Sequence, residues 1–119
     1  MIKQIISIEV EAHIKDKPQS ILLDVRTEEE WNVDGRPDGE KLGLKTYFLT
    51  IKDQNFINDF KKLAINKDQE ILTMCMGGVR SQAAAELLIG EDYKCTNISD
   101  GFLGNSASPG WKNSGLPCK

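Results

Sequence analysis

One loop holds the residues best suited to covalent chemistry, because a cysteine is followed by two glycines, an arginine and a serine. It reads Cys75-Met76-Gly77-Gly78-Val79-Arg80-Ser81. Glycines permit backbone torsions closed to other residues, so successive N–H groups can converge on one point. A helix that starts there adds unpaired N–H donors and the positive end of its dipole. We therefore expect an anion-binding cradle, formed by the backbone of residues 76–81, with the Cys75 thiol at its rim.

This environment predicts a reactive thiol. Converging N–H donors and a nearby cation favour the thiolate form of a cysteine, which is the nucleophile, near neutral pH. Arg80 supplies a permanent positive charge that can hold an anionic substrate. By contrast, Cys95 is expected to be a small buried apolar residue, and Cys118 an exposed free thiol.

Other kinds of site lack the residues that they need. The 119 residues contain three cysteines, no Cys-x-x-Cys pair and one histidine, His13, so neither a zinc site nor a disulfide framework is expected. No organic cofactor is implied. A net charge of −3 without a basic run gives no footprint for nucleic acid or an anionic membrane. Because we find neither a membrane-spanning apolar run nor a secretory signal, we expect the protein in the cytoplasm.

The elements that must position this loop alternate along the chain. Short β-branched or aromatic runs predict strands at residues 21–25, 46–51, 71–74 and 95–99. Helical patterns lie between them: a capping box of Thr27 and Glu30, an amphipathic stripe at residues 56–64, and another at 83–88 that ends near Gly90. Residues 34–43, rich in glycine, predict an irregular loop.

The first segment fits two structures. Residues 8–14 alternate between apolar and polar as a strand does, yet Ser7 followed by Glu9 and Glu11 suits the start of a helix. We favour the helix, with His13 on its exposed surface.

Strands that alternate with helices predict one α/β domain over residues 1–119, with a mainly parallel sheet covered by helices on both faces. Ligands of such sheets bind at the carboxyl ends of the strands. Cys75 directly follows the strand at residues 71–74, so we expect the thiol at this edge of the sheet.

Three stretches resemble the single-domain rhodanese family. The run Leu23-Asp24-Val25-Arg26-Thr27-Glu28-Glu29-Glu30-Trp31 is similar to the family's Asp-x-Arg signature. The family's Cys-x-x-Gly-x-Arg-Ser loop resembles Cys75, Gly78, Arg80, Ser81 and Ala84. The family's closing segment is similar to Asp100-Gly101 followed by Trp111, Gly115, Leu116 and Pro117.

The resemblance implies a five-stranded rhodanese-like fold and a sulfurtransferase. Cys75 would attack the outer sulfur of a donor such as thiosulfate and become a persulfide. It would then pass the sulfur to cyanide or to a thiol, including that of a thioredoxin-like protein. The amides of residues 76–81 would stabilise the sulfur anion, and Arg80 would orient the donor's sulfonate. Asp24 and Arg26 would brace the loop as a buried ion pair rather than contact the substrate.

Two segments depart from the family pattern. Residues 33–40 are longer and more polar than the His-Ile-Pro-Gly-Ala run of many relatives, and residues 103–110 are longer than usual. The composition of the second segment predicts a mobile loop of the kind that borders sites. These departures leave the physiological donor and acceptor open.

Two other functions stay open on the same fold. A cysteine-dependent phosphatase or arsenate reductase resembles Cys-x5-Arg, whereas four residues separate Cys75 from Arg80, and this smaller ring suits one sulfur atom better than a phosphate. A non-catalytic binding module would be indicated by a Cys75 that is buried and does not react with iodoacetamide. A cysteine protease lacks its usual base, since His13 lies in the first segment.

Overall fold

Five short strands form one sheet in which every neighbouring pair runs parallel. The computed structural model describes residues 2–52 and 54–119 and orders the strands β1-β5-β4-β2-β3. Along the chain they are β1 (Lys3–Ile5), β2 (Ile21–Asp24), β3 (Lys45–Phe48), β4 (Glu70–Met74) and β5 (Lys94–Ile98). This confirms the expected five-stranded α/β sheet and places β4, which precedes Cys75, at its centre.

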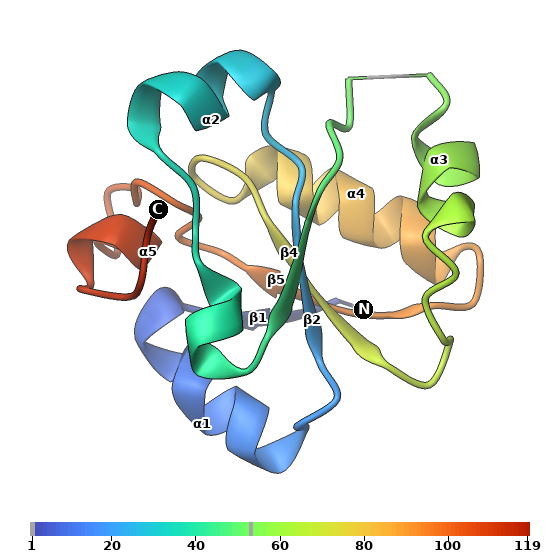
Figure 1. Ribbon diagram of the computed structural model, residues 1–119, viewed down its shortest axis with the longest axis horizontal. Helices are drawn as coiled ribbons and strands as arrows, with labels where there is room; N and C mark the ends of the chain where they lie inside the picture. Colours follow the sequence, from blue (N-terminus) through green and yellow to red (C-terminus); the bar gives the residue numbers. More distant parts are fainter. Residues whose placement is uncertain (1, 53) are drawn as a thin grey trace.

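Helices cover both faces of the sheet, as expected (Figure 1). One face packs against α3 (Phe56–Lys62) and α4 (Val79–Ile89), and the other against α1 (Val10–Asp16) and α5 (Gly110–Asn113). The helix α2 (Glu28–Asp34) lies beyond the carboxyl end of β2. The chain also forms two short 3-10 helices, η1 (Ser7–Glu9) and η2 (Gly39–Leu42). No helix in the described part of the chain is long and apolar enough to cross a membrane.

The alternation of side chains along the strands divides the core into two clusters, one on each face. Leu23 belongs to a cluster with Phe60 of α3 and Leu88 of α4. Its neighbour Leu22 belongs to a second cluster with Trp111 of α5. Burial of one such side chain contributes roughly 1.5–3 kcal/mol. Because both faces are covered, the central strands are apolar at consecutive positions, which explains their short uninterrupted runs in the sequence.

The N-terminal segment contains both a strand and a helix. The edge strand β1 is three residues long and has no counterpart among the predicted strands. Residues 10–16 form α1, which confirms the helix favoured for this segment. The expectation that His13 lies on the surface is wrong: Val10 and His13 share one helical face, both are buried, and His13 is 7 % exposed. Burial lowers the pKa of His13.

Local signals located the start of α2 but not the start of α4. The Thr27 hydroxyl accepts a hydrogen bond from the Glu30 amide, and a Glu30 carboxylate oxygen accepts one from the Thr27 amide, as the capping box predicts. The predicted stripe starts at Ala83, whereas α4 begins at Val79. Its N-cap is Gly78 in a left-handed conformation, not one of the side chains that usually mark a helix start. Residues 79–81 are therefore its first turn rather than part of a loop.

Residues 34–43 are only partly irregular. They include the turn η2, and Pro37 forms an isolated antiparallel bridge with Cys118. This bridge holds the segment that leaves α2 against the end of the described chain.

Candidate active site at the Cys75 loop

Cys75 lies at the carboxyl end of the central strand, directly after Met74. This is the edge of a parallel sheet at which ligands bind, and it is where the sequence predicted the thiol. Because α4 begins at Val79, the free N–H groups of its first turn and the positive end of its dipole lie beside the loop.

Two glycines allow the backbone to close tightly around Cys75. Gly78 has a φ of 105°, and a Cβ there would overlap the backbone carbonyl of Ser99. Gly101 has a φ of 61°, and a Cβ there would overlap the carbonyls of Cys75 and Met76. Only glycine fits at either position. The loop and the segment that follows β5 can therefore lie backbone against backbone.

Two donor groups lie within hydrogen-bond distance of the sulfur of Cys75. The Gly78 N–H lies 3.1 Å from Sγ, and the Ser81 hydroxyl lies 3.4 Å from it. The Gly78 amide belongs to the predicted backbone cradle, whereas the Ser81 hydroxyl is a side-chain donor that the prediction did not include. The other amides of residues 76–81 make no such bond within the described chain, so the cradle is only partly formed around the resting sulfur.

Cys75 is enclosed by the segment that follows β5. It is 1 % exposed. Its carbonyl accepts a hydrogen bond of 2.8 Å from the Phe102 amide, and the Met76 carbonyl accepts one of 3.1 Å from the Leu103 amide. These bonds hold the segment after β5 over the loop. Reactivity rather than exposure therefore distinguishes a catalytic Cys75 from a buried structural one.

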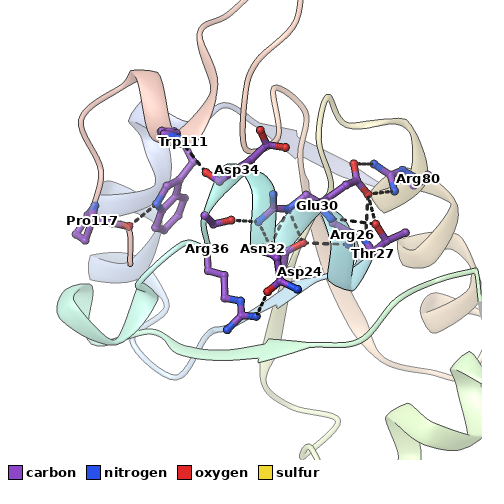
Figure 2. A network of polar contacts seen from close by, with 12 residues as sticks. Asp24, Arg26, Thr27, Glu30, Asn32, Asp34, Arg36, Arg80, Trp111 and Pro117 are labelled. Atoms are coloured by element: carbon purple, nitrogen blue, oxygen red, sulfur yellow. Dashed lines mark hydrogen bonds and ion pairs between the residues drawn. The ribbon is translucent and has the colours of Figure 1, made fainter.

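Arg80 is held by a glutamate that the sequence assigned only to a helix cap. Its Nη1 and Nη2 donate to the two carboxylate oxygens of Glu30 at 2.6 and 2.8 Å, as Figure 2 shows. This partly buried ion pair joins α4 to α2. The hydrogen bonds from Arg80, helped by those from Thr27, lower the pKa of Glu30 to about 2, although burial opposes the shift. The same contact raises the pKa of Arg80.

Asp24 and Arg26 form the buried ion pair that was expected. Arg26 Nη2 lies 2.9 Å from Asp24 Oδ2, Nε donates to both carboxylate oxygens, and neither side chain is exposed. The guanidinium also donates to the Gly35 carbonyl and lies 4.1 Å from the centre of the Phe102 ring. The amide of Phe102 in turn bonds to Cys75. The pair thus braces the loop through Phe102 and has no direct contact with the sulfur.

Segment 103–110 borders the loop, as its composition predicted. The Asn105 side chain is the link: its Nδ2 donates to the Gly77 carbonyl at 3.2 Å and to the Ser99 carbonyl at 2.9 Å. Its Oδ1 accepts from the amides of Ala107 and Ser108. These contacts could not be predicted, because Asn105 sits among residues typical of any loop.

Asn97 of β5 makes a second contact that was not predicted from the sequence. Its Oδ1 lies 2.6 Å from the Ser81 hydroxyl that also reaches Cys75. One signal was present: an asparagine within a strand of a buried parallel sheet needs hydrogen-bond partners inside the fold.

The other cysteines differ sharply from Cys75. Cys95 is buried, as expected, and burial, together with the charge of Glu70, raises its pKa to about 12. Cys118 is half-buried rather than exposed, because its backbone pairs with Pro37, and burial raises its pKa. All three are free thiols.

A cavity of about 400 Å³ opens on the β5 side of the loop. It is lined by Gly77, Gly78, Val79, Gln4, Gln82, Asn97 and Ser99. This lining offers amides and a hydroxyl but no charged side chain. Elsewhere, residues 2–52 and 54–119 contain no group of three or more His, Cys, Asp or Glu side chains that could hold a metal ion.

Comparisons with known proteins agree with this geometry. The sequence model of the Rhodanese-like domain matches residues 8–107. An uncharacterized protein of Rickettsia prowazekii is 41% identical over 101 residues, covering 82% of this chain and 81% of that protein. Among solved structures, Rv0390 from M. tuberculosis has a TM-score of 0.82 and 28% identity, covering 98% of this chain and 96% of its own. A rhodanese-like domain protein from Staphylococcus aureus has a TM-score of 0.72 and 22% identity, covering 99% of each chain.

Proposed function

This chain belongs to the rhodanese-like domain family, and from that premise we propose that it is a sulfurtransferase in which Cys75 carries sulfur as a persulfide. One observation supports this most strongly. At the carboxyl end of β4, a backbone N–H donates to Cys75 Sγ and a hydroxyl lies within hydrogen-bond reach of it, as a sulfur that bears negative charge requires.

The proposed reaction has two displacements and needs no oxidant or reductant. The Cys75 thiolate attacks the outer sulfur of thiosulfate, a bond forms between the two sulfurs, and sulfite leaves with the electron pair of the broken sulfur–sulfur bond. Cyanide or a thiolate then attacks the outer sulfur of the persulfide anion. With cyanide the products are thiocyanate and the regenerated Cys75 thiolate.

The backbone of residues 76–81 is assigned the role of stabilising the outer sulfur. The first turn of α4 supplies free N–H groups near the loop, and only the Gly78 amide is occupied by the resting sulfur. The outer sulfur of the persulfide, placed beyond Sγ, can accept hydrogen bonds from the remaining N–H groups.

Arg80 is assigned the role of binding the negatively charged sulfonate end of the sulfur donor. A guanidinium has five N–H donors, and Glu30 takes up two of them. The remaining donors, close enough to Cys75 for the two groups to interact electrostatically, can meet a sulfonate. Glu30 fixes the side chain in this position.

The experiment that tests this function measures thiocyanate produced from thiosulfate and cyanide. Wild-type protein should form it continuously, and Cys75→Ser should form none above the uncatalysed rate. The same preparations are assayed for phosphate release from an aryl phosphate. Phosphate release that depends on Cys75, with no thiocyanate formed, would replace this function with the phosphatase alternative.

The physiological donor and acceptor are narrowed by the same assay. Thiosulfate is compared with mercaptopyruvate as the donor, and cyanide with glutathione and a thioredoxin-like protein as the acceptor.

Three unpaired thiols support the expectation that the protein works in a reducing compartment such as the cytoplasm.

A further inference from the structure

The Ser81 hydroxyl has one hydrogen and three acceptors within reach. Its Oγ lies 2.6 Å from Asn97 Oδ1, 3.2 Å from the Gly78 carbonyl and 3.4 Å from Cys75 Sγ. A hydroxyl donates one hydrogen bond at a time. Ser81, Asn97 and Cys75 are all buried, so water does not resolve the competition. The short distance to Asn97 assigns the hydrogen to its amide oxygen while the sulfur is a neutral thiol.

The surroundings of Asn97 fix the orientation of its amide. Nδ2 lies 3.1 Å from the Gly78 carbonyl, which can only accept, so this end must be the donor. The opposite end, Oδ1, faces two hydroxyls, those of Ser81 and Thr73. Thr73 is the residue opposite Asn97 in the register of β4 and β5, so the sheet itself holds the amide in place.

We propose that Asn97 is a positioning residue that competes with Cys75 for the Ser81 hydrogen and thereby sets the balance between thiolate stability and nucleophilicity at the sulfur. This inference rests on the proposed function, since the balance matters only if Cys75 attacks a donor. When Cys75 ionises, the hydrogen must leave Asn97 to reach the sulfur. The thiolate therefore gains less from Ser81 than it would from an uncommitted hydroxyl.

This competition has a chemical consequence. A thiolate that is stabilised less strongly is a better nucleophile once formed, and the fastest exchange is reached when half of the thiol ionises near ambient pH. Without Asn97, the Ser81 hydrogen would settle on the sulfur. The Gly78 carbonyl competes poorly for it, because it already accepts from the Gln82 amide and because bonds to an ionised acceptor are about twice as strong.

The test measures the rate at which iodoacetamide alkylates Cys75 across pH, followed by mass spectrometry of the peptide that contains Cys75. The midpoint of this profile reports ionisation, whereas access to the buried sulfur scales the rate equally at every pH. Asn97→Leu removes the competing acceptor at similar volume. It should lower the midpoint by about half a pH unit or more, where a full pH unit corresponds to ~1.4 kcal/mol. Ser81→Ala removes the donor and should raise the midpoint.

The double variant Ser81→Ala/Asn97→Leu decides the mechanism. With no hydrogen to compete for, Asn97→Leu should leave the midpoint of Ser81→Ala unchanged. An equal shift in both backgrounds, or no shift in either, would overturn the proposal. Gln82→Met is the matched control, because it alters a neighbour of Asn97 Nδ2 and leaves Oδ1 in place. Its midpoint should equal that of the wild type.

A second substitution covers the case in which Asn97→Leu does not fold, as judged by circular dichroism. Asn97→Asp keeps an acceptor towards Ser81 and should raise the midpoint, by more in the wild-type background than in Ser81→Ala. Equal shifts in the two backgrounds would assign the effect to charge alone and would refute the competition. A Cys75 that is not alkylated at any pH would also refute it. Thiocyanate formation, measured on the same samples, tests the proposed function separately. The alkylation midpoints of the variants can shift as expected while no thiocyanate forms, and thiocyanate can form while the midpoints do not shift as expected.

Discussion

At the scale of single residues, Cys75 and Cys95 differ in what surrounds the sulfur rather than in how deeply they lie. Cys75 and Cys95 are both buried. The Gly78 amide and the Ser81 hydroxyl both lie within hydrogen-bond distance of Cys75 Sγ, whereas burial raises the pKa of Cys95 to about 12. Burial alone would make both thiols inert, so we expect the donors near Cys75 to make it the reactive one.

This contrast predicts selective alkylation near neutral pH. Iodoacetamide should modify Cys75 and leave Cys95 unmodified, and Cys118 should react slowly because burial raises its pKa. Peptide mass spectrometry of the wild type and of Cys75→Ser checks the assignment. Unmodified Cys75 after prolonged exposure of folded protein would favour the non-catalytic binding module.

Replacing Arg80 should weaken the binding of thiosulfate. Replacing it with alanine removes the cation beside the loop, and the concentration of thiosulfate that gives half-maximal thiocyanate formation should rise about tenfold or more, as expected for a lost charged hydrogen bond. Lys61→Ala serves as the control, because it removes a cation that pairs with Glu91 beyond the far end of α4. An unchanged thiosulfate dependence in Arg80→Ala would refute the role assigned to Arg80.

At the scale of elements, the Glu30–Arg80 pair ties the helix after β2 to the helix after β4. The folded-state pKa of Glu30, about 2, lies below its ordinary value of 4.5, so the folded protein binds fewer protons than the unfolded chain between these values. The pair therefore stabilises the fold fully above about pH 4.5. This contribution falls as the pH drops towards 2.

This linkage is checked with Glu30→Gln, which keeps an oxygen that can accept from the Thr27 amide and loses the charge. The urea midpoint of the wild type should exceed that of the variant above pH 4.5, and the two should converge as the pH approaches 2. A constant difference at every pH would show that the carboxylate charge contributes nothing.

The close approach of the loop to the segment after β5 predicts different outcomes for two glycines. Gly43→Ala introduces a side chain at positive φ with no atom within 4 Å, and should cost about 1 kcal/mol from backbone strain alone. Gly78→Ala carries the same kind of strain and also meets the Ser99 carbonyl, so it should destabilise more and abolish alkylation of Cys75. Native reactivity in Gly78→Ala would show that this contact does not shape the site.

What the sequence revealed at this scale was local. The capping box of Thr27 and Glu30 located α2, and β-branched runs located four strands, because these signals depend on neighbouring residues. The start of α4 was missed because its N-cap is Gly78, and β1 was missed because three residues at a sheet edge leave little pattern. His13 was misplaced because the pattern did not show which face of α1 meets the sheet.

At the scale of the whole molecule, the site depends on contacts between distant parts of the chain. Glu30 meets Arg80, Asn105 meets Gly77, and Asn97 meets Ser81 across separations of 50, 28 and 16 residues. Such pairs arise only once the parallel sheet brings the ends of β2, β4 and β5 to one edge. The Cys75 loop could therefore be singled out as the candidate site from its local sequence, but the groups that orient and enclose Cys75 could not.

Persulfide formation at Cys75 is tested by the mass of the intact protein after incubation with thiosulfate and removal of excess donor. The protein should gain one sulfur atom, mapped to Cys75, lost on addition of cyanide and absent from Cys75→Ser. Cys95→Ser should still gain it. A protein that is alkylated at Cys75 but never gains sulfur, or a Cys75→Ser variant that gains it undiminished, would show that Cys75 does not carry sulfur.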